Sequence, residues 1–177
     1  KTDGWHPREY GLLSDGALAI LSWIFWLITA IGDFPTATRE VDIMLYIKAT
    51  GGRRPIGHFR SIFRLWAVVM RAPIAEWSAE ADDEEFCAGA GGNPLDPVWR
   101  QAVRAEAGRA NGEAAGLHLG DLQKAYEHVQ HDRLWEKGQE EKYLLAQLRV
   151  TLRADRWARR IFLGKLASAD ICAINGI

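Results

Sequence analysis

The chain has 177 residues, of which 48% are hydrophobic and 25% are charged, and its formal net charge is −1. This composition excludes an intrinsically disordered chain, and the length is sufficient for one hydrophobic core. The two cysteines, Cys87 and Cys172, are too few for a disulfide framework, which favours an intracellular location, nuclear or cytoplasmic. Because the first residue is Lys1 rather than methionine, we expect the sequence to be a piece of a longer protein.

The longest uncharged segment, residues 17–31, favours a buried core helix. Ser14 or Asp15 is expected to cap its start, and Gly32 to end it. The segment is shorter than the roughly 20 residues that a membrane-spanning helix needs. A small membrane-associated helical protein is therefore the less favoured interpretation, and we expect no membrane partner.

The middle of the chain predicts a hairpin followed by a helix. Residues 41–48 alternate between apolar and polar side chains, as in a half-buried strand, and Gly51-Gly52 is typical of a turn. A short return strand is expected over residues 53–56. Residues 59–70 carry apolar side chains at helical spacing, with Arg60 and Arg64 one turn apart on another face.

The rest of the chain predicts mostly helices. Residues 76–97 are first acidic and then rich in Gly, Ala and Pro, which is typical of a long loop. Helices are expected at residues 98–110 and 134–154, and a short strand at 117–120. Two short strands around a turn are expected near the C-terminus, at residues 161–163 and 171–174. The predicted fold class is α+β, mostly helical, with short antiparallel strands.

The charges are segregated along the chain even though their sum is close to zero. Residues 53–71 contain five arginines and no acid, and residues 76–85 contain six acids and no base. Residues 149–165 contain six bases and one acid, Asp155. Such basic segments predict a phosphate-bearing partner, although solvated helix faces give the same pattern.

Asp121 begins the segment that holds the main candidate catalytic residue, DLQKAYEHVQHDRL. A carboxylate at a strand end can bind a divalent metal, but a lone Asp favours the simpler interpretation of a cap for the helix that follows. His131 is expected to make a polar contact at the junction between strand and helix. The adjacent pair Asp82-Asp83 lies within an acidic run and is not expected to be catalytic.

The pattern D-L-x-K-A-Y-E-x-V-x-H over residues 121–131 resembles the first catalytic motif of reverse transcriptases of non-LTR retrotransposons. Residues 48–57, KATGGRRPIG, resemble the hairpin of the polymerase fingers. Asp3-Gly4 with Pro7 resembles the opening of the fingers, and the segment from Phe86 to Asp96 resembles the one before the palm. The phrases GLLSDGAL and WRQAVRAEA are similar to dinoflagellate-type elements, and the resemblance runs from about residue 3 to residue 177.

The resemblance implies a partial right-hand polymerase fold, with fingers over residues 1–116 and the start of the palm over residues 117–177. The implied activity is RNA-templated DNA synthesis from dNTPs by two-metal nucleotidyl transfer. The implied partners are an RNA template, a DNA primer, the incoming dNTP and the rest of the palm and thumb.

The resemblance also assigns roles to individual residues. Asp121 is the catalytic carboxylate and binds Mg²⁺, with Mn²⁺ as the other possible ion, and the carbonyl of Leu122 adds a ligand. Tyr126 is the steric gate under the sugar of the dNTP. Without the motif, we would interpret Tyr126 as a core aromatic side chain.

The basic residues of the fingers receive roles as well. Lys48 and Arg54 reach the triphosphate of the dNTP, for which ammonium and guanidinium groups are suited. An exposed hairpin with unpaired charges is the alternative. Arg60 and Arg64 are expected to contact the backbone of the template.

After Asp121 the sequence holds no Asp-Asp pair and no glycine-rich motif of the kind that this family has between its catalytic motifs. Two-metal catalysis needs more carboxylates than one. We therefore expect this chain to be inactive when isolated. The alternative is a non-catalytic remnant of a retroelement that at most binds nucleic acid.

Overall fold

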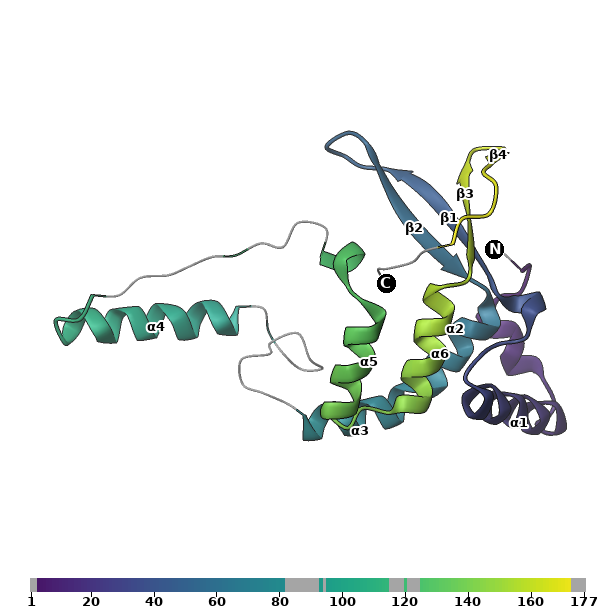
Figure 1. The fold of residues 1–177 in the computed structure, drawn as a ribbon, viewed down its shortest axis with the longest axis horizontal. Coiled ribbons are helices and arrows are strands. Elements are labelled where there is room, and N and C mark those ends of the chain that lie inside the picture. The colour runs from purple at the N-terminus through teal and green to yellow at the C-terminus, as the bar shows by residue number, and fades with distance from the viewer. Residues whose placement is uncertain (1–2, 82–92, 94, 115–119, 121–124, 173–177) are drawn as a thin grey trace. The chain divides into compact units, whose positions relative to one another are not determined.

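The computed structural model describes residues 3–81, 93, 95–114, 120 and 125–172 (Figure 1). The chain divides into two compact units. The first unit combines residues 1–71 with residues 126–177, and the second unit consists of residues 72–125. Segments from both ends of the sequence therefore build one unit together.

A four-stranded sheet forms part of the first unit, with strand order β2-β1-β3-β4. Its strands are β1 (Glu40–Ile47), β2 (Arg53–Phe59), β3 (Ala158–Leu163) and β4 (Leu166–Ala167). The two hairpins, β1–β2 and β3–β4, are antiparallel, whereas the central pair β1–β3 is parallel. The α+β class is confirmed, but the expectation of antiparallel strands is wrong for the central pair. A parallel pair needs a long crossover connection, and here all of residues 48–157 supply it.

The first long helix is α1 (Asp15–Ile31), and its ends follow the sequence signals. The hydroxyl of Ser14 accepts a hydrogen bond from the amide of Ala17 at 3.3 Å, which satisfies a donor that the helix itself leaves free. Gly32 ends the helix in the left-handed conformation, with φ of 83°. The predicted caps are therefore confirmed.

The expectation of a buried core helix holds for one side of α1 only. Within α1 only Phe25 and Ile28 are buried. The large apolar side chains Trp23, Trp26 and Ile31 are each 60% or more exposed. One stripe of α1 thus packs on the core, while the opposite face of the helix is both apolar and uncovered in the described residues.

Helix α2 (Ser61–Val69) begins after β2 and packs against α1. The carboxylate of Asp3 accepts hydrogen bonds from the amide and the hydroxyl of Ser61, both at 2.6 Å. Asp3 therefore acts as a cap for α2 that comes from a distant part of the sequence. Burial works to raise the pKa of Asp3, but the bonds from Ser61 and the amide of Trp5 outweigh it, and the pKa is lowered.

The core of the first unit is an aromatic cluster around Phe34, which is 1% exposed. Its ring contacts the rings of Phe63, Trp66 and Trp157, with centroids 5.4, 5.8 and 5.6 Å away. The indole N–H of Trp157 donates to the carboxylate of Asp33 at 3.3 Å. The cluster joins the end of α1 to α2 and to the segment that leads into β3.

The single helix predicted over residues 134–154 is two helices, α5 (His131–Glu140) and α6 (Leu145–Asp155), so that prediction is wrong. Lys142 adopts a left-handed conformation with φ of 53°, and the amide of Tyr143 donates to the carbonyl of Gly138 at 2.7 Å. This is a helix C-terminus of Schellman type. Gly138 also allows close packing, because a Cβ atom at this position would collide with Leu148.

The first of the two strands predicted near the C-terminus, residues 161–163, lies within β3 and is confirmed. Of the second, predicted over residues 171–174, only residues 171 and 172 are described, and the strand that follows β3 is instead β4. Gly164, with φ of 61°, makes the turn between β3 and β4. Ile171 forms an isolated antiparallel bridge with Arg159. The described part of this unit also contains three short 3-10 helices, namely Pro7–Leu12, Thr36–Thr38 and Ala125–His128, the last of which starts one residue before the unit boundary.

The second unit contains α4 (Asp96–Ala110) and all but the first residue of α3 (Arg71–Glu80). The helix predicted over residues 98–110 is therefore confirmed. The long loop predicted from residue 76 is wrong for residues 76–80, which continue α3. The strand predicted over residues 117–120 lies outside the described residues except for Gly120.

Candidate nucleic-acid interface

The β1–β2 hairpin carries the basic residues to which the sequence assigns phosphate contacts. In its turn, the amide of Lys48 donates to the carbonyl of Gly52, and the amide of Gly51 donates to the carbonyl of Lys48, both at 3.1 Å. Gly51 and Gly52 have φ values of 87° and 79°. Side chains with a Cβ atom rarely adopt this conformation, which explains the glycine pair in the sequence.

The strand register decides which hairpin side chains share a face. Arg54 lies opposite Tyr46 across the hairpin, and side chains opposite each other in an antiparallel pair are on the same face. Lys48 follows Tyr46 by two residues, so the alternation of the strand directs it to that face too. Lys48 and Arg54 are both exposed. The hairpin therefore presents two cations near its tip on one side of the sheet.

At the other end of the hairpin, the same face of the sheet carries a network of ion pairs. Arg60 forms an ion pair with Glu40, and Arg160 approaches Glu40 at 3.3 Å and Asp170 at 2.8 Å. The pKa of Arg160 is raised by its hydrogen bonds to Asp170 and by the negative charge of Asp170. The negative charge of Glu40 raises it to a smaller extent. Arg60 is thus held by a carboxylate at the junction of β2 and α2. Arg64, one turn further along α2, is exposed.

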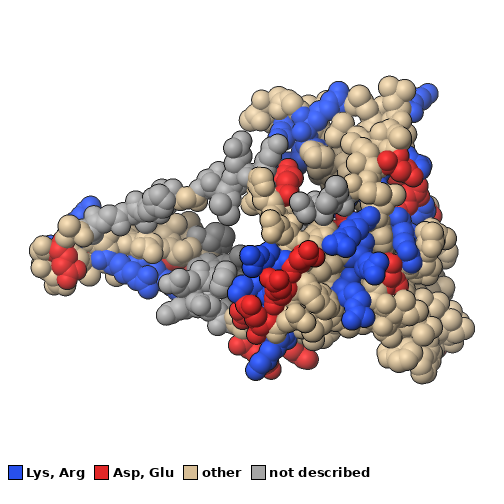
Figure 2. All heavy atoms as spheres, in the orientation of Figure 1, with Lys and Arg blue, Asp and Glu red and all other residues tan. Residues whose placement is uncertain are grey.

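A second basic surface, which residue-by-residue sequence reasoning did not single out, lies on α6. Arg149, Arg153 and Arg156 recur at i, i+4 and i+7 and line a hollow of about 240 Å³. The guanidinium of Arg149 lies over the ring of Trp135, 6.0 Å from its centroid. Figure 2 shows blue side chains gathered over the region of α6. The basic segment 149–165 was the sequence signal for this surface, and the helical spacing would have located it.

One buried polar residue, His131, lines this hollow, and a second, Asp155, interacts with His131 and Arg159. His131 is 3% exposed, and its Nδ1 accepts a hydrogen bond from Nε of Arg156 at 3.1 Å. The polar contact predicted for His131 is therefore confirmed. Burial raises the pKa of Asp155, although the charges of Arg159 and His131 work in the opposite direction. The hydrogen bond with His131 holds Arg156 at the edge of the hollow.

The residues assigned to catalysis are described only in part. Asp121 and Leu122 lie outside the described residues. Tyr126 lies in the 3-10 helix Ala125–His128 and is 70% exposed, so it is not the core aromatic of the alternative interpretation. Among the described residues, no group of three or more His, Cys, Asp or Glu side chains is placed to hold a metal ion. Asp82 and Asp83 are also outside the described residues.

The helices in the described ranges include none that is both long enough and apolar enough to cross a membrane.

No protein-family model matches the chain, and no curated protein matches it either. The resemblance to reverse transcriptases therefore rests on the motifs of the sequence itself.

Proposed function

We propose that the chain is the fingers and the start of the palm of a reverse transcriptase, which copies RNA into DNA from dNTPs. The observation that carries this proposal is the run of residues from Asp121 to His131, in which an Asp, a Lys-Ala-aromatic-acid group, a Val and a His keep the spacing of the first catalytic motif. In this role Asp121 binds Mg²⁺, which aligns the attacking hydroxyl with the triphosphate.

The hairpin supports the proposal independently of that motif. The segment from Lys48 to Gly57 that resembles the fingers hairpin does form an antiparallel hairpin, with two exposed cations on one face near its tip. A guanidinium binds two phosphate oxygens at once, and an ammonium adds a point charge. Lys48 and Arg54 therefore bind the triphosphate, and the exposed Arg64 contacts the template backbone.

Arg60 receives a different role within this proposal. Arg60 forms an ion pair with Glu40, and the negative carboxylate weakens the attraction of the Arg60 guanidinium for a phosphate. Arg60 is therefore a positioning residue, which joins the end of β2 to the edge of β1 and sets the direction of α2. Tyr126 is exposed, so its ring is accessible to a ligand, which supports the role of steric gate.

Nucleic-acid binding without polymerisation is the second candidate function. The specific observation in its favour is the hollow on α6, where three arginines and Trp135 meet. Arginine contacts phosphate and an aromatic ring stacks on a base, so the hollow suits a single-stranded nucleic acid. This candidate needs neither Asp121 nor a metal ion.

Two binding measurements test the proposal. In the first, a fluorescent RNA template with an annealed DNA primer is titrated with the chain at several salt concentrations. We expect the affinity to fall as salt rises, because each phosphate contact releases a bound cation. In the second, a fluorescent dATP analogue with Mg²⁺ is titrated in the presence of the primer–template. The variant Lys48→Ala/Arg54→Ala should lose at least about tenfold in affinity for dATP, since hydrogen bonds to charged groups contribute about 1.5–3 kcal/mol each.

The matched control is Arg133→Ala/Lys137→Ala, which also removes one arginine and one lysine. These two residues are exposed on α5 and pair with Glu136 and Glu140. The control should keep the dATP affinity of the unaltered chain. Equal losses in the two double variants, or a primer–template affinity that is independent of salt, would contradict the proposal.

A further inference from the structure

The outer face of α1 is an exposed apolar surface that the proposed function does not use. Ile20, Trp23, Leu27 and Ile31 follow one another at spacings of three, four and four residues, which places them on one side of the helix. With the neighbouring Trp26, they are between 47% and 70% exposed. The buried Phe25 and Ile28 point to the opposite side. Spacing of this kind is typical of a seam between packed helices.

The outer face of α1 is uncharged as well as exposed. From Gly16 to Gly32 the sequence contains no Asp, Glu, Lys or Arg, and Figure 2 shows the region of α1 as an area without blue or red side chains. A helix that is apolar on all sides is normally buried. Isolated apolar residues on a surface are ordinary, but a contiguous patch of several hundred Å² marks an interaction site.

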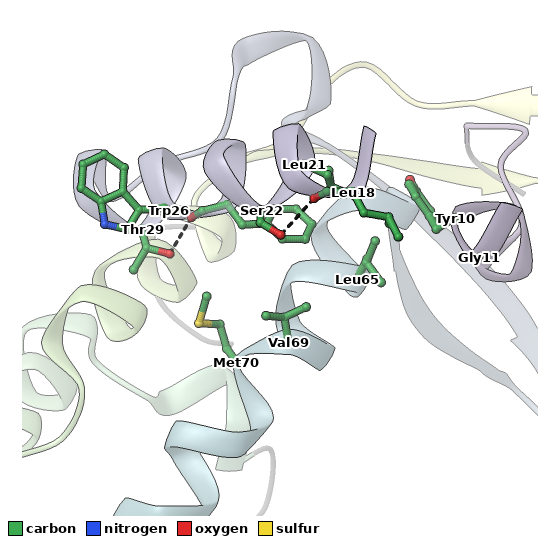
Figure 3. Close-up of a pocket in the computed structure, with 11 residues that line it drawn as sticks. Tyr10, Gly11, Leu18, Leu21, Ser22, Trp26, Thr29, Leu65, Val69 and Met70 are labelled. Atoms are coloured by element: carbon green, nitrogen blue, oxygen red, sulfur yellow. Dashed lines mark hydrogen bonds between the residues drawn. The ribbon is translucent and has the colours of Figure 1, made fainter. Parts of the chain in front are cut away.

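Two apolar cavities flank Trp26. The larger, of about 530 Å³, lies between α1, α2 and the 3-10 helix Pro7–Leu12 (Figure 3). The hydroxyls of Ser22 and Thr29 at this cavity donate to the carbonyls of Leu18 and Phe25 in their own helix, at 3.0 and 2.9 Å. The second cavity, of about 420 Å³, is lined by Ser22, Trp23 and Trp26. Because these hydroxyls are already bonded within the helix, the cavities suit apolar side chains better than a polar ligand.

We infer that the outer face of α1 is a dimer interface that packs against the same face of a second copy of this chain. The five exposed side chains offer roughly 700 Å² of apolar surface, given the size of aromatic and branched side chains. Two copies would bury about 1,400 Å² in total, which is within the range of a standard stable interface.

The chemistry of the face also favours a second copy over other partners. In a two-fold interface each patch meets itself, so charged groups would oppose their own copies, and this face has none. Tryptophan is enriched at the centres of such interfaces. A helix that lies on a membrane surface has a polar face rich in Lys and Arg, whereas the only charged residue of α1 is Asp15.

Sedimentation velocity of the purified chain across micromolar concentrations tests this inference. The unaltered chain should sediment as a single species of twice its mass of 19.8 kDa. Trp23→Glu should shift it to the monomer, because a carboxylate at the seam would be buried without a partner. Ile31→Lys is a second variant with the same expected result, at a residue that is 70% exposed. Far-UV circular dichroism of each variant confirms that it folds.

Trp99→Glu is the matched control, since Trp99 is as exposed as Trp23 but lies on α4. It should leave the dimer intact. A monomeric unaltered chain, or dimers that survive both α1 variants, would overturn the inference. Flotation of the unaltered chain with phosphatidylcholine vesicles, with or without phosphatidylserine, would also overturn it in favour of a lipid partner. These readouts involve no nucleotide, so they succeed or fail independently of the proposed function.

Discussion

Truncation of Phe34 to alanine should remove a large part of the stability of the first unit. Phe34 is 1% exposed and touches three other aromatic rings at centroid distances below 6 Å. Replacing a buried Phe by Ala typically costs about 3–5 kcal/mol, through lost burial and the cavity left behind. Because whole domains are stable by only about 5–15 kcal/mol, we expect a loss near 4 kcal/mol, which is about a quarter or more of the total.

The assay is urea unfolding followed by tryptophan fluorescence, since Trp66 and Trp157 lie in the cluster itself. Phe34→Leu should cost less, about 1–2 kcal/mol, because it keeps most of the buried volume but loses the edge-to-face ring contacts. Leu12→Ala is the control, at a side chain that is 85% exposed, and should change the free energy of unfolding by no more than about 0.5 kcal/mol. A loss below about 1 kcal/mol for Phe34→Ala would refute the role of this cluster as the core.

Three further outcomes follow from the same contacts. Asp3→Ala should cost about 1 kcal/mol at neutral pH, as the loss of a helix cap does. The lowered pKa of Asp3 means that its contribution is complete above the ordinary value of 3.8 and is lost as the pH falls through the lowered value, so thermal melts of variant and unaltered chain should converge in acid. For Asp155 the raised pKa reverses the sign: the ionised form is disfavoured in the folded state, so Asp155→Asn should raise the melting temperature at neutral pH and have less effect in acid. In a primer-extension assay with Mg²⁺ or Mn²⁺, the 177-residue chain should incorporate no dNTP, because its sequence has no Asp-Asp pair after Asp121; robust incorporation would show that expectation to be wrong.

The ends of α1 and the hairpin turn could be predicted from the sequence, because they depend on residues that are close together in the chain. Helix α1 begins after Ser14 and ends at Gly32, because a hydroxyl cap and a left-handed glycine act within a few residues. Gly51 and Gly52 located the hairpin turn for the same reason. The break between α5 and α6 was missed because Lys142 is not a residue type that usually adopts positive φ, although Gly138 within the predicted helix was a signal of close packing.

Features that depend on contacts across the sequence could not be predicted in this way. The parallel pairing of β1 with β3 joins Glu40 to Ala158, and no local pattern encodes such a partner. The ion pair of Arg60 with Glu40 depends on the same sheet, so Arg60 looked as available to a nucleic acid as Arg64. The uncharged stretch of α1 predicted a buried helix, but in the described residues only one side of it packs on the core and its outer face is exposed.

Photo-cross-linking of a primer–template that carries 4-thiouridine in the template strand tests the central claim most directly. After digestion, mass spectrometry identifies the cross-linked peptides. The proposed function predicts cross-links to the β1–β2 hairpin or to the part of α2 that carries Arg64, and fewer of them as salt rises. Cross-links confined to α6 would favour the second candidate function over a polymerase. Cross-links confined to α4, or none at all, would contradict nucleic-acid binding by the first unit.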